Sequence, residues 1–204
     1  MPDAVSPTAA MADYFAVFGL PRRLLLDVPG LEREFYRQSR RLHPDRFARA
    51  ARLDQDAALR QMSQLNDAFR VLADPIARIV YLLDLGGVRR RDERGDAGVE
   101  RAPQVPAELL EEVFELNMAL DEARSGGLTD PGTRRQLVQA QADFQEKLEV
   151  VDAALLERAA AWDRAQDAGE TGGDILQQLS SLLDRRSYLR NLLRDVAVVL
   201  VPAP

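Results

Sequence analysis

The sequence predicts an all-α protein built from two helical domains. Apolar side chains recur every three or four residues along most of the 204-residue chain, and no segment shows the alternation of a half-buried strand. Glycine and proline separate these periodic segments. Charge also differs between the halves: residues 11–86 carry 12 arginines and 10 acids, whereas residues 107–204 carry 10 basic and 18 acidic side chains. We therefore expect two domains with different partners.

The first domain is predicted to hold four helices. A short aromatic helix over 11–18 ends at Gly19. A second helix over 31–42, after a loop that contains Pro29-Gly30, ends before His43 because Pro44 disfavours helical dihedral angles there. It is followed by a long helix over 51–72, whose inward stripe is Ala58, Met62, Leu65, Phe69 and Leu72.

The last helix of this domain begins at Asp74-Pro75, where an acidic N-cap precedes a proline in the first turn, and ends at Gly86-Gly87. We expect the second and third helices to form an antiparallel hairpin with the two short helices at its flanks. Residues 87–106 are charged and punctuated by glycine and proline, so they are predicted to be a linker.

The second domain, 107–204, is predicted to be an antiparallel three-helix bundle. Its helices are expected from Pro106 to Arg124, over 131–167 and over 174–200, with glycines in both connections. The core stripe of the last helix is predicted as Ile175, Leu179, Leu182, Leu189, Leu193, Val196 and Leu200.

The composition excludes several classes of function. The chain has no cysteine and one histidine, which excludes disulfides, thiolate ligands and multi-histidine metal sites. A di-iron carboxylate bundle would need paired Glu-x-x-His motifs, which a single histidine cannot supply. The net charge of −6 disfavours nucleic acid, and no apolar run approaches the ~20 residues of a membrane span. The first ten residues do not resemble a signal peptide. We expect a cytoplasmic protein without cofactor, metal or enzymatic activity.

The second helix carries a basic face beside a distinctive loop. Arginines 33, 37, 40 and 41 lie opposite Leu31, Phe35 and Leu42, and the loop reads His43-Pro44-Asp45. Together with the segments ADYFAVFGLP and LNDAFRVLADP, this pattern resembles the J domain of DnaJ-type co-chaperones. The resemblance implies that His43, Pro44, Asp45 and the four arginines bind a DnaK-class chaperone and stimulate its ATPase. Forked guanidinium donors suit carboxylates on such a partner.

The helix before Arg124 has more apolar surface than a bundle requires. One row, Leu109, Val113, Leu116 and Leu120, is predicted to face the bundle. A second row, Leu110, Phe114 and Met118, points elsewhere and is accompanied by Glu111, Glu115 and Glu122. Periodicity alone leaves two interpretations open: an interaction surface, or a face that packs against the first domain. Tyr188 is similarly placed about 220° from Ile175, on the polar side of the last helix, and is either incidental or an interface anchor.

A J domain followed by an acidic three-helix bundle resembles the HscB family of iron–sulfur co-chaperones. The segments HPDRFA, LNDAFRVLADPIARIVYLLDLGG and LLEEVFELNMALDEAR carry this resemblance. It implies that the bundle binds the scaffold protein IscU and that the J domain delivers IscU to the chaperone HscA, whose ATPase it activates during iron–sulfur protein maturation. The implied scaffold contacts are Leu110, Glu111, Phe114, Glu115, Met118, Glu122 and Tyr188. The alternative is a general J-domain adaptor for a different client.

Overall fold

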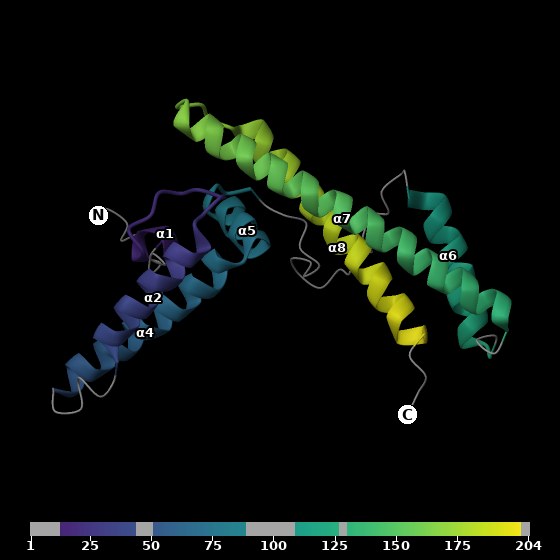
Figure 1. Ribbon diagram of the computed structural model, residues 1–204, viewed down its shortest axis with the longest axis horizontal. Helices are drawn as coiled ribbons and strands as arrows, with labels where there is room; N and C mark the ends of the chain where they lie inside the picture. The colour runs from purple at the N-terminus through teal and green to yellow at the C-terminus, as the bar shows by residue number, and fades with distance from the viewer. Residues whose placement is uncertain (1–12, 44–50, 89–108, 127–129, 201–204) are drawn as a thin grey trace, which may run out of the picture. The chain divides into compact units, whose positions relative to one another are not determined.

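The computed structural model describes residues 13–43, 51–88, 109–126 and 130–200. Within these ranges the chain forms seven α-helices and no strand, so the predicted all-α class is confirmed. The chain divides into two compact units, Met1–Gly86 and Gly87–Pro204 (Figure 1). Most of the predicted linker, from residue 89 onward, lies outside the described residues. No helix in the described ranges is long and apolar enough to cross a membrane.

The first unit contains a helical pair with two short helices at its sides. Its elements are α1 (Tyr14–Val17), α2 (Val28–Leu42), α4 (Arg52–Ala73) and α5 (Pro75–Leu85). Figure 1 shows α2 and α4 side by side, as the predicted hairpin requires. The helix α2 begins three residues earlier than predicted: Pro29 was placed in a loop but lies in the first turn, where the missing N–H breaks no helical hydrogen bond.

The core of this unit joins aromatic and aliphatic side chains from all four helices. The rings of Phe35 in α2 and Phe69 in α4 stack with centroids 4.4 Å apart. Arg78 of α5 is buried, and its guanidinium donates to the backbone carbonyls of Leu72, at 2.7 Å, and Leu24. These bonds satisfy a charge that would otherwise be costly to bury. They also fasten α5 to the loop before α2.

The second unit consists of α6 (Leu110–Arg124), α7 (Pro131–Asp167) and α8 (Gly173–Leu200). The bounds of α7 match the prediction, because Asp130 caps the helix by accepting a hydrogen bond from the Thr133 N–H at 2.8 Å and Pro131 opens it. The N-terminal part of the predicted first helix, 106–108, lies outside the described residues.

Ion pairs join α7 to each of its neighbouring helices in the second unit. Arg186 of α8 donates to Asp152 of α7 at 2.6 Å, and Lys147 of α7 lies 3.1 Å from Glu112 of α6. Positions 147 and 152 differ by about 140° around α7. The two neighbouring helices therefore make these ion pairs on different sides of α7.

Candidate protein-binding surfaces

The helix α6 presents two apolar rows in opposite environments. Leu109, Val113, Leu116 and Leu120, the row predicted to face the bundle, are all buried. The second row remains exposed: the exposed fractions are 54% for Leu110, 66% for Phe114 and 61% for Met118. Three large apolar side chains at this spacing form one continuous stripe on the helix. Such a stripe is typical of a protein-binding site.

Acidic side chains accompany this stripe. Glu111, Glu115 and Glu122 of α6 are all exposed. We define the α6 surface as the set Leu110, Glu111, Phe114, Glu115, Met118 and Glu122. An apolar centre with carboxylates beside it favours a partner whose own apolar patch is surrounded by basic groups.

The ion pair between Glu112 and Lys147 joins the first turn of α6 to α7. The Glu112 carboxylate lies 3.1 Å from Lys147, the only lysine of the chain. The contact is partly buried, since 33% of the Lys147 side chain and 44% of the Glu112 side chain are exposed. The buried row sets the orientation of α6, and this ion pair adds a partly exposed contact to it.

The sequence predicted that Tyr188 lies on the polar side of α8, but the structure shows it buried. Only 8% of its surface is exposed, and burial raises the pKa of its phenol. The prediction was wrong because α8 contacts both α7 and α6, so its buried surface is wider than one stripe. Leu183 and Leu192, outside the predicted stripe, are buried for the same reason. Tyr188 is therefore no part of the exposed α6 surface in this structure.

The four arginines of the predicted basic face of α2 are all exposed, and two of them form ion pairs with nearby acids. Arg37 lies 2.7 Å from Glu34, and Arg33 lies 3.5 Å from Asp27. Arg40 donates to the backbone carbonyl of Tyr36 at 3.2 Å. Arg41 has no ion pair or hydrogen bond within the described ranges. The face is therefore not the purely basic one that the arginine pattern alone predicted: Glu34 lies three residues before Arg37, and Asp27 is the N-cap residue of α2.

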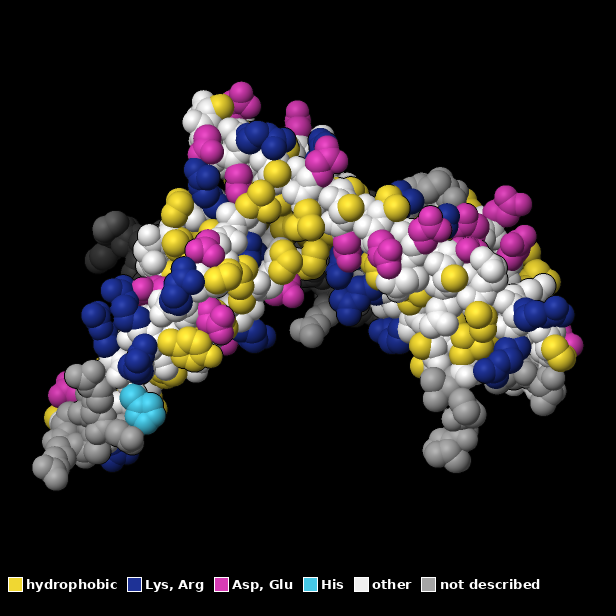
Figure 2. Space-filling model, in the orientation of Figure 1, with side chains coloured by type: hydrophobic (Ala, Val, Ile, Leu, Met, Phe, Trp, Pro, Cys, Tyr) yellow, Lys and Arg dark blue, Asp and Glu magenta, His cyan; other side chains and the backbone are white. Residues whose placement is uncertain are grey.

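His43 lies at the carboxyl end of α2 and is exposed. The helix ends at Leu42 as predicted, and His43 takes an extended conformation with φ −59° and ψ 132°. In Figure 2 it is the cyan side chain at the end of the helical pair of the first unit. Pro44 and Asp45, the other two residues of the predicted chaperone-binding loop, lie outside the described residues.

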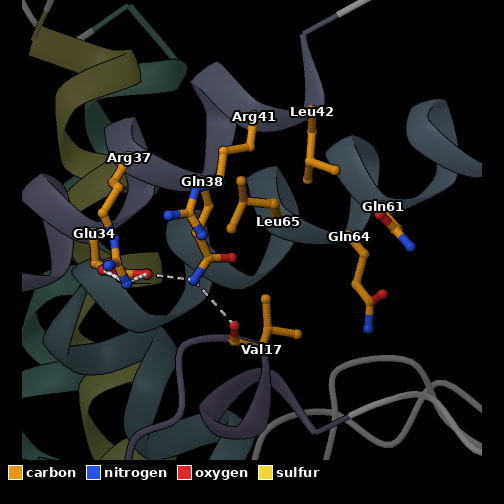
Figure 3. A pocket seen from close by; sticks show the side chains of 9 residues that line it. All are labelled: Val17, Glu34, Arg37, Gln38, Arg41, Leu42, Gln61, Gln64 and Leu65. Carbon is orange, nitrogen blue, oxygen red and sulfur yellow. Dashed lines mark hydrogen bonds and ion pairs between the residues drawn. The ribbon is translucent and has the colours of Figure 1, made fainter. Parts of the chain in front are cut away.

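A cleft between α2 and α4 opens beside this basic face (Figure 3). Its volume is about 370 Å³. Nine residues line it: Val17, Glu34, Arg37, Gln38, Arg41, Leu42, Gln61, Gln64 and Leu65. The sequence alone does not predict this cleft, because its lining comes from α1, α2 and α4, and helical periodicity does not reveal how these helices pack on one another.

The residues in the described ranges form no group of three or more histidine, cysteine or acidic side chains able to hold a metal ion. The two candidate sites are the α6 surface on the second unit and the arginine face of α2 on the first.

Comparison with known proteins identifies the family. A co-chaperone protein HscB homolog from Chromobacterium violaceum is 33% identical over 137 residues, which cover 67% of this chain and 74% of that protein. The chain belongs to the HscB co-chaperone family. No family model matches the chain.

Two further relatives carry the same description. The HscB homologs of Azoarcus sp. and Aromatoleum aromaticum are 36% identical over 118 residues and 35% identical over 115 residues. These matches cover 58% and 56% of this chain, and 63% and 61% of the relatives, so the chain spans about three fifths of their length.

Solved structures of the family share the fold. Chaperone HscB from Vibrio cholerae superposes with a TM-score of 0.63 and 26% identity, over 92% of this chain and 97% of that one. The human co-chaperone protein HscB gives a TM-score of 0.57 at 20% identity, over 99% of this chain and 86% of that one, and supports the fold alone.

Proposed function

We propose that this chain is a cytoplasmic co-chaperone that binds the iron–sulfur scaffold protein IscU and delivers it to the DnaK-class chaperone HscA. The observation that carries the scaffold part is the exposed row Leu110, Phe114 and Met118 beside a buried row on the same helix. Burial of that row against a partner would remove apolar surface from water at little cost in ordering, because α6 is already formed.

The chaperone part is proposed for the first unit. Exposed arginines on α2 offer bidentate donors to carboxylates of the chaperone. His43 directly follows that helix, so a partner bound along α2 would also reach the loop that His43 begins. The chain is proposed to do no chemistry itself: ATP hydrolysis takes place on the chaperone, and binding accelerates it.

With the α6 surface on one unit and the arginine face of α2 on the other, a single chain would bind client and chaperone together. A client held by one unit experiences a high effective concentration of the chaperone held by the other. ATP hydrolysis is then coupled to capture of that client, which promotes maturation of iron–sulfur proteins.

A reconstituted ATPase assay tests the proposal. Purified HscA-type chaperone is measured alone, with the chain, with IscU, and with both, and the chain is measured without chaperone. We expect the greatest stimulation with both proteins and no hydrolysis by the chain. Absence of stimulation would contradict the chaperone part. Stimulation without measurable IscU binding would favour the alternative of an adaptor for another client, which capture of partners from cytosol would then identify.

A further inference from the structure

Met118 is an exposed methionine in a chain that has no cysteine. The sequence contains four methionines, of which Met62 and Met118 lie within the described residues. Met62 is half-buried in α4, whereas 61% of Met118 is exposed on α6. Oxidation of a sulfur-containing side chain follows its exposure. Of these two side chains, Met118 is therefore the one that a dissolved peroxide reaches more readily.

Met118 lies in the apolar row at the centre of the α6 surface. It follows Phe114 by four residues and precedes Glu122 by four, and side chains at this spacing are neighbours on a helix. The Cβ atoms of such neighbours are about 5–6 Å apart. A partner that covers the Phe114 ring would therefore cover Met118 as well.

A peroxide changes this side chain in a two-electron step. The thioether sulfur attacks one oxygen of hydrogen peroxide, the O–O bond breaks, and the products are a sulfoxide and water. The sulfur loses two electrons and the peroxide gains them, so no further co-reactant is needed. A flexible apolar side chain becomes a polar one that carries an S=O acceptor.

The consequence differs between the free chain and the complex. In the free chain the sulfoxide stays in water, because most of Met118 is exposed. In a complex on the α6 surface it would lie against apolar groups of the partner, where a polar group without a hydrogen-bond donor is costly to bury. Oxidation should therefore weaken binding and leave the stability of the chain unchanged.

We propose that Met118 is a peroxide-sensitive modification site, and that its sulfoxide weakens binding of the scaffold protein to the α6 surface. Methionine sulfoxide reductases, one for each epimer, return a sulfoxide to the thioether, so the modification is reversible. The inference rests on the proposed function for the identity of the partner.

Peptide mapping of the full-length chain tests the site itself. The chain is exposed to hydrogen peroxide for increasing times, the peroxide is removed with catalase, and the digested chain is analysed by mass spectrometry. Met118 should oxidise at least about threefold faster than Met62, as its greater exposure predicts. Equal rates for the two methionines would overturn the assignment of the site.

Calorimetric titration with IscU tests the effect on binding, and each Kd is compared with that of the same variant before peroxide treatment. Peroxide should raise the Kd of the wild type about tenfold, and the two reductases together should reverse the increase. Met118→Leu, which nearly conserves the side-chain volume, should show no such increase. Met62→Leu is the matched control and should show the same increase as the wild type. The thermal midpoint of oxidised Met62→Leu should equal that of the untreated variant.

Two results of the titration would overturn the inference while the proposed function stands. One is an unchanged Kd in the oxidised wild type, and the other is an equal increase of the Kd in oxidised Met118→Leu. If the untreated wild type fails to bind IscU, the proposed function fails and the effect on binding fails with it. The peptide map alone then decides whether Met118 is the sensitive site.

Discussion

Val113 and Phe114 are adjacent in α6, yet 5% of Val113 is exposed and 66% of Phe114 is exposed. Successive residues of a helix point about 100° apart, so neighbours can belong to different faces. The inner face holds α6 in the bundle, and the outer face is free to meet a partner. Substitutions on the two faces should therefore separate stability from binding.

Phe114→Ala should weaken binding of the scaffold protein by about 1–3 kcal/mol, because it removes the largest apolar side chain of the α6 surface. The midpoint of thermal unfolding should stay nearly unchanged, since the ring makes little contact within the protein. Isothermal titration calorimetry with IscU, together with a thermal melt, measures both. Wild-type affinity in this variant would contradict the assignment of the α6 surface.

The matched control lies on the inner face of the same helix. Leu116 is 2% exposed, and Leu116→Ala should lower the free energy of unfolding by about 2–5 kcal/mol. Where the variant remains folded, its affinity for IscU should fall much less than that of the Phe114 variant. Urea unfolding and the same titration provide the comparison.

Local rules were enough to predict most helix bounds and the two rows of α6. Asp130-Pro131 and Asp74-Pro75 are recognisable helix starts. In each, the aspartate carboxylate accepts a hydrogen bond from an N–H of the first turn, and the proline has no N–H that would need a partner. The rows of α6 follow from helical periodicity, which is fixed by backbone geometry. The predicted start of α2 was three residues late because Pro29-Gly30 is compatible with a turn as well as with the first turn of a helix. The structure shows the helix.

Features that depend on the register between helices could not be predicted. Tyr188 is buried because α8 packs on two helices. A prediction of one apolar stripe on an isolated helix does not include the second contact. The cleft beside Arg41 requires the relative placement of α2 and α4. The hydrogen bond between Glu34 and Arg37 lies within one helix and was open to prediction from their three-residue spacing.

His43→Gln should abolish stimulation of the chaperone ATPase and leave IscU binding unchanged. His43 is exposed and follows the last residue of α2, so its replacement should disturb the loop without unfolding the unit. Steady-state ATP hydrolysis measures the first effect, and calorimetry with IscU measures the second. Stimulation at the wild-type level would show that this loop has no part in activation.

Tyr81→Phe should destabilise the first unit by about 1 kcal/mol. The Tyr81 hydroxyl accepts a hydrogen bond from the Tyr14 N–H at 2.9 Å and lies 3.4 Å from the Asp13 carboxylate. Phenylalanine keeps the stacking on Tyr14, whose ring centroid is 4.6 Å away, but loses both polar contacts. Urea unfolding monitored by signals of the first unit measures the change, and equal stability would contradict the role of the hydroxyl.

The same substitution should reduce the loss of stability in alkali. Burial raises the pKa of Tyr81, so the folded protein holds this proton to higher pH than the unfolded chain does. The contribution of the protonated phenol is fully present below the unfolded pKa of about 10 and is lost as pH rises through the folded pKa. Comparison of unfolding at pH 9 and pH 11 should show a smaller decrease for Tyr81→Phe than for the wild type. An identical decrease would mean that Tyr81 does not contribute to it.

Gly172→Ala should destabilise the turn between α7 and α8, whereas Gly173→Ala should not. Gly172 has φ +58°, and a Cβ there would lie 2.7 Å from Cζ3 and 2.9 Å from Cε3 of Trp162. Left-handed backbone and contact with a buried indole together should cost about 1–3 kcal/mol of unfolding free energy. A Cβ at Gly173 meets no atom within 4 Å, so alanine there should be neutral or stabilise by up to about 1 kcal/mol. Thermal unfolding of the two variants measures the difference. Equal midpoints would show that the Trp162 side chain moves to accommodate the added methyl group. The packing of the indole on Gly172 would then add nothing to the stability of the α7–α8 hairpin.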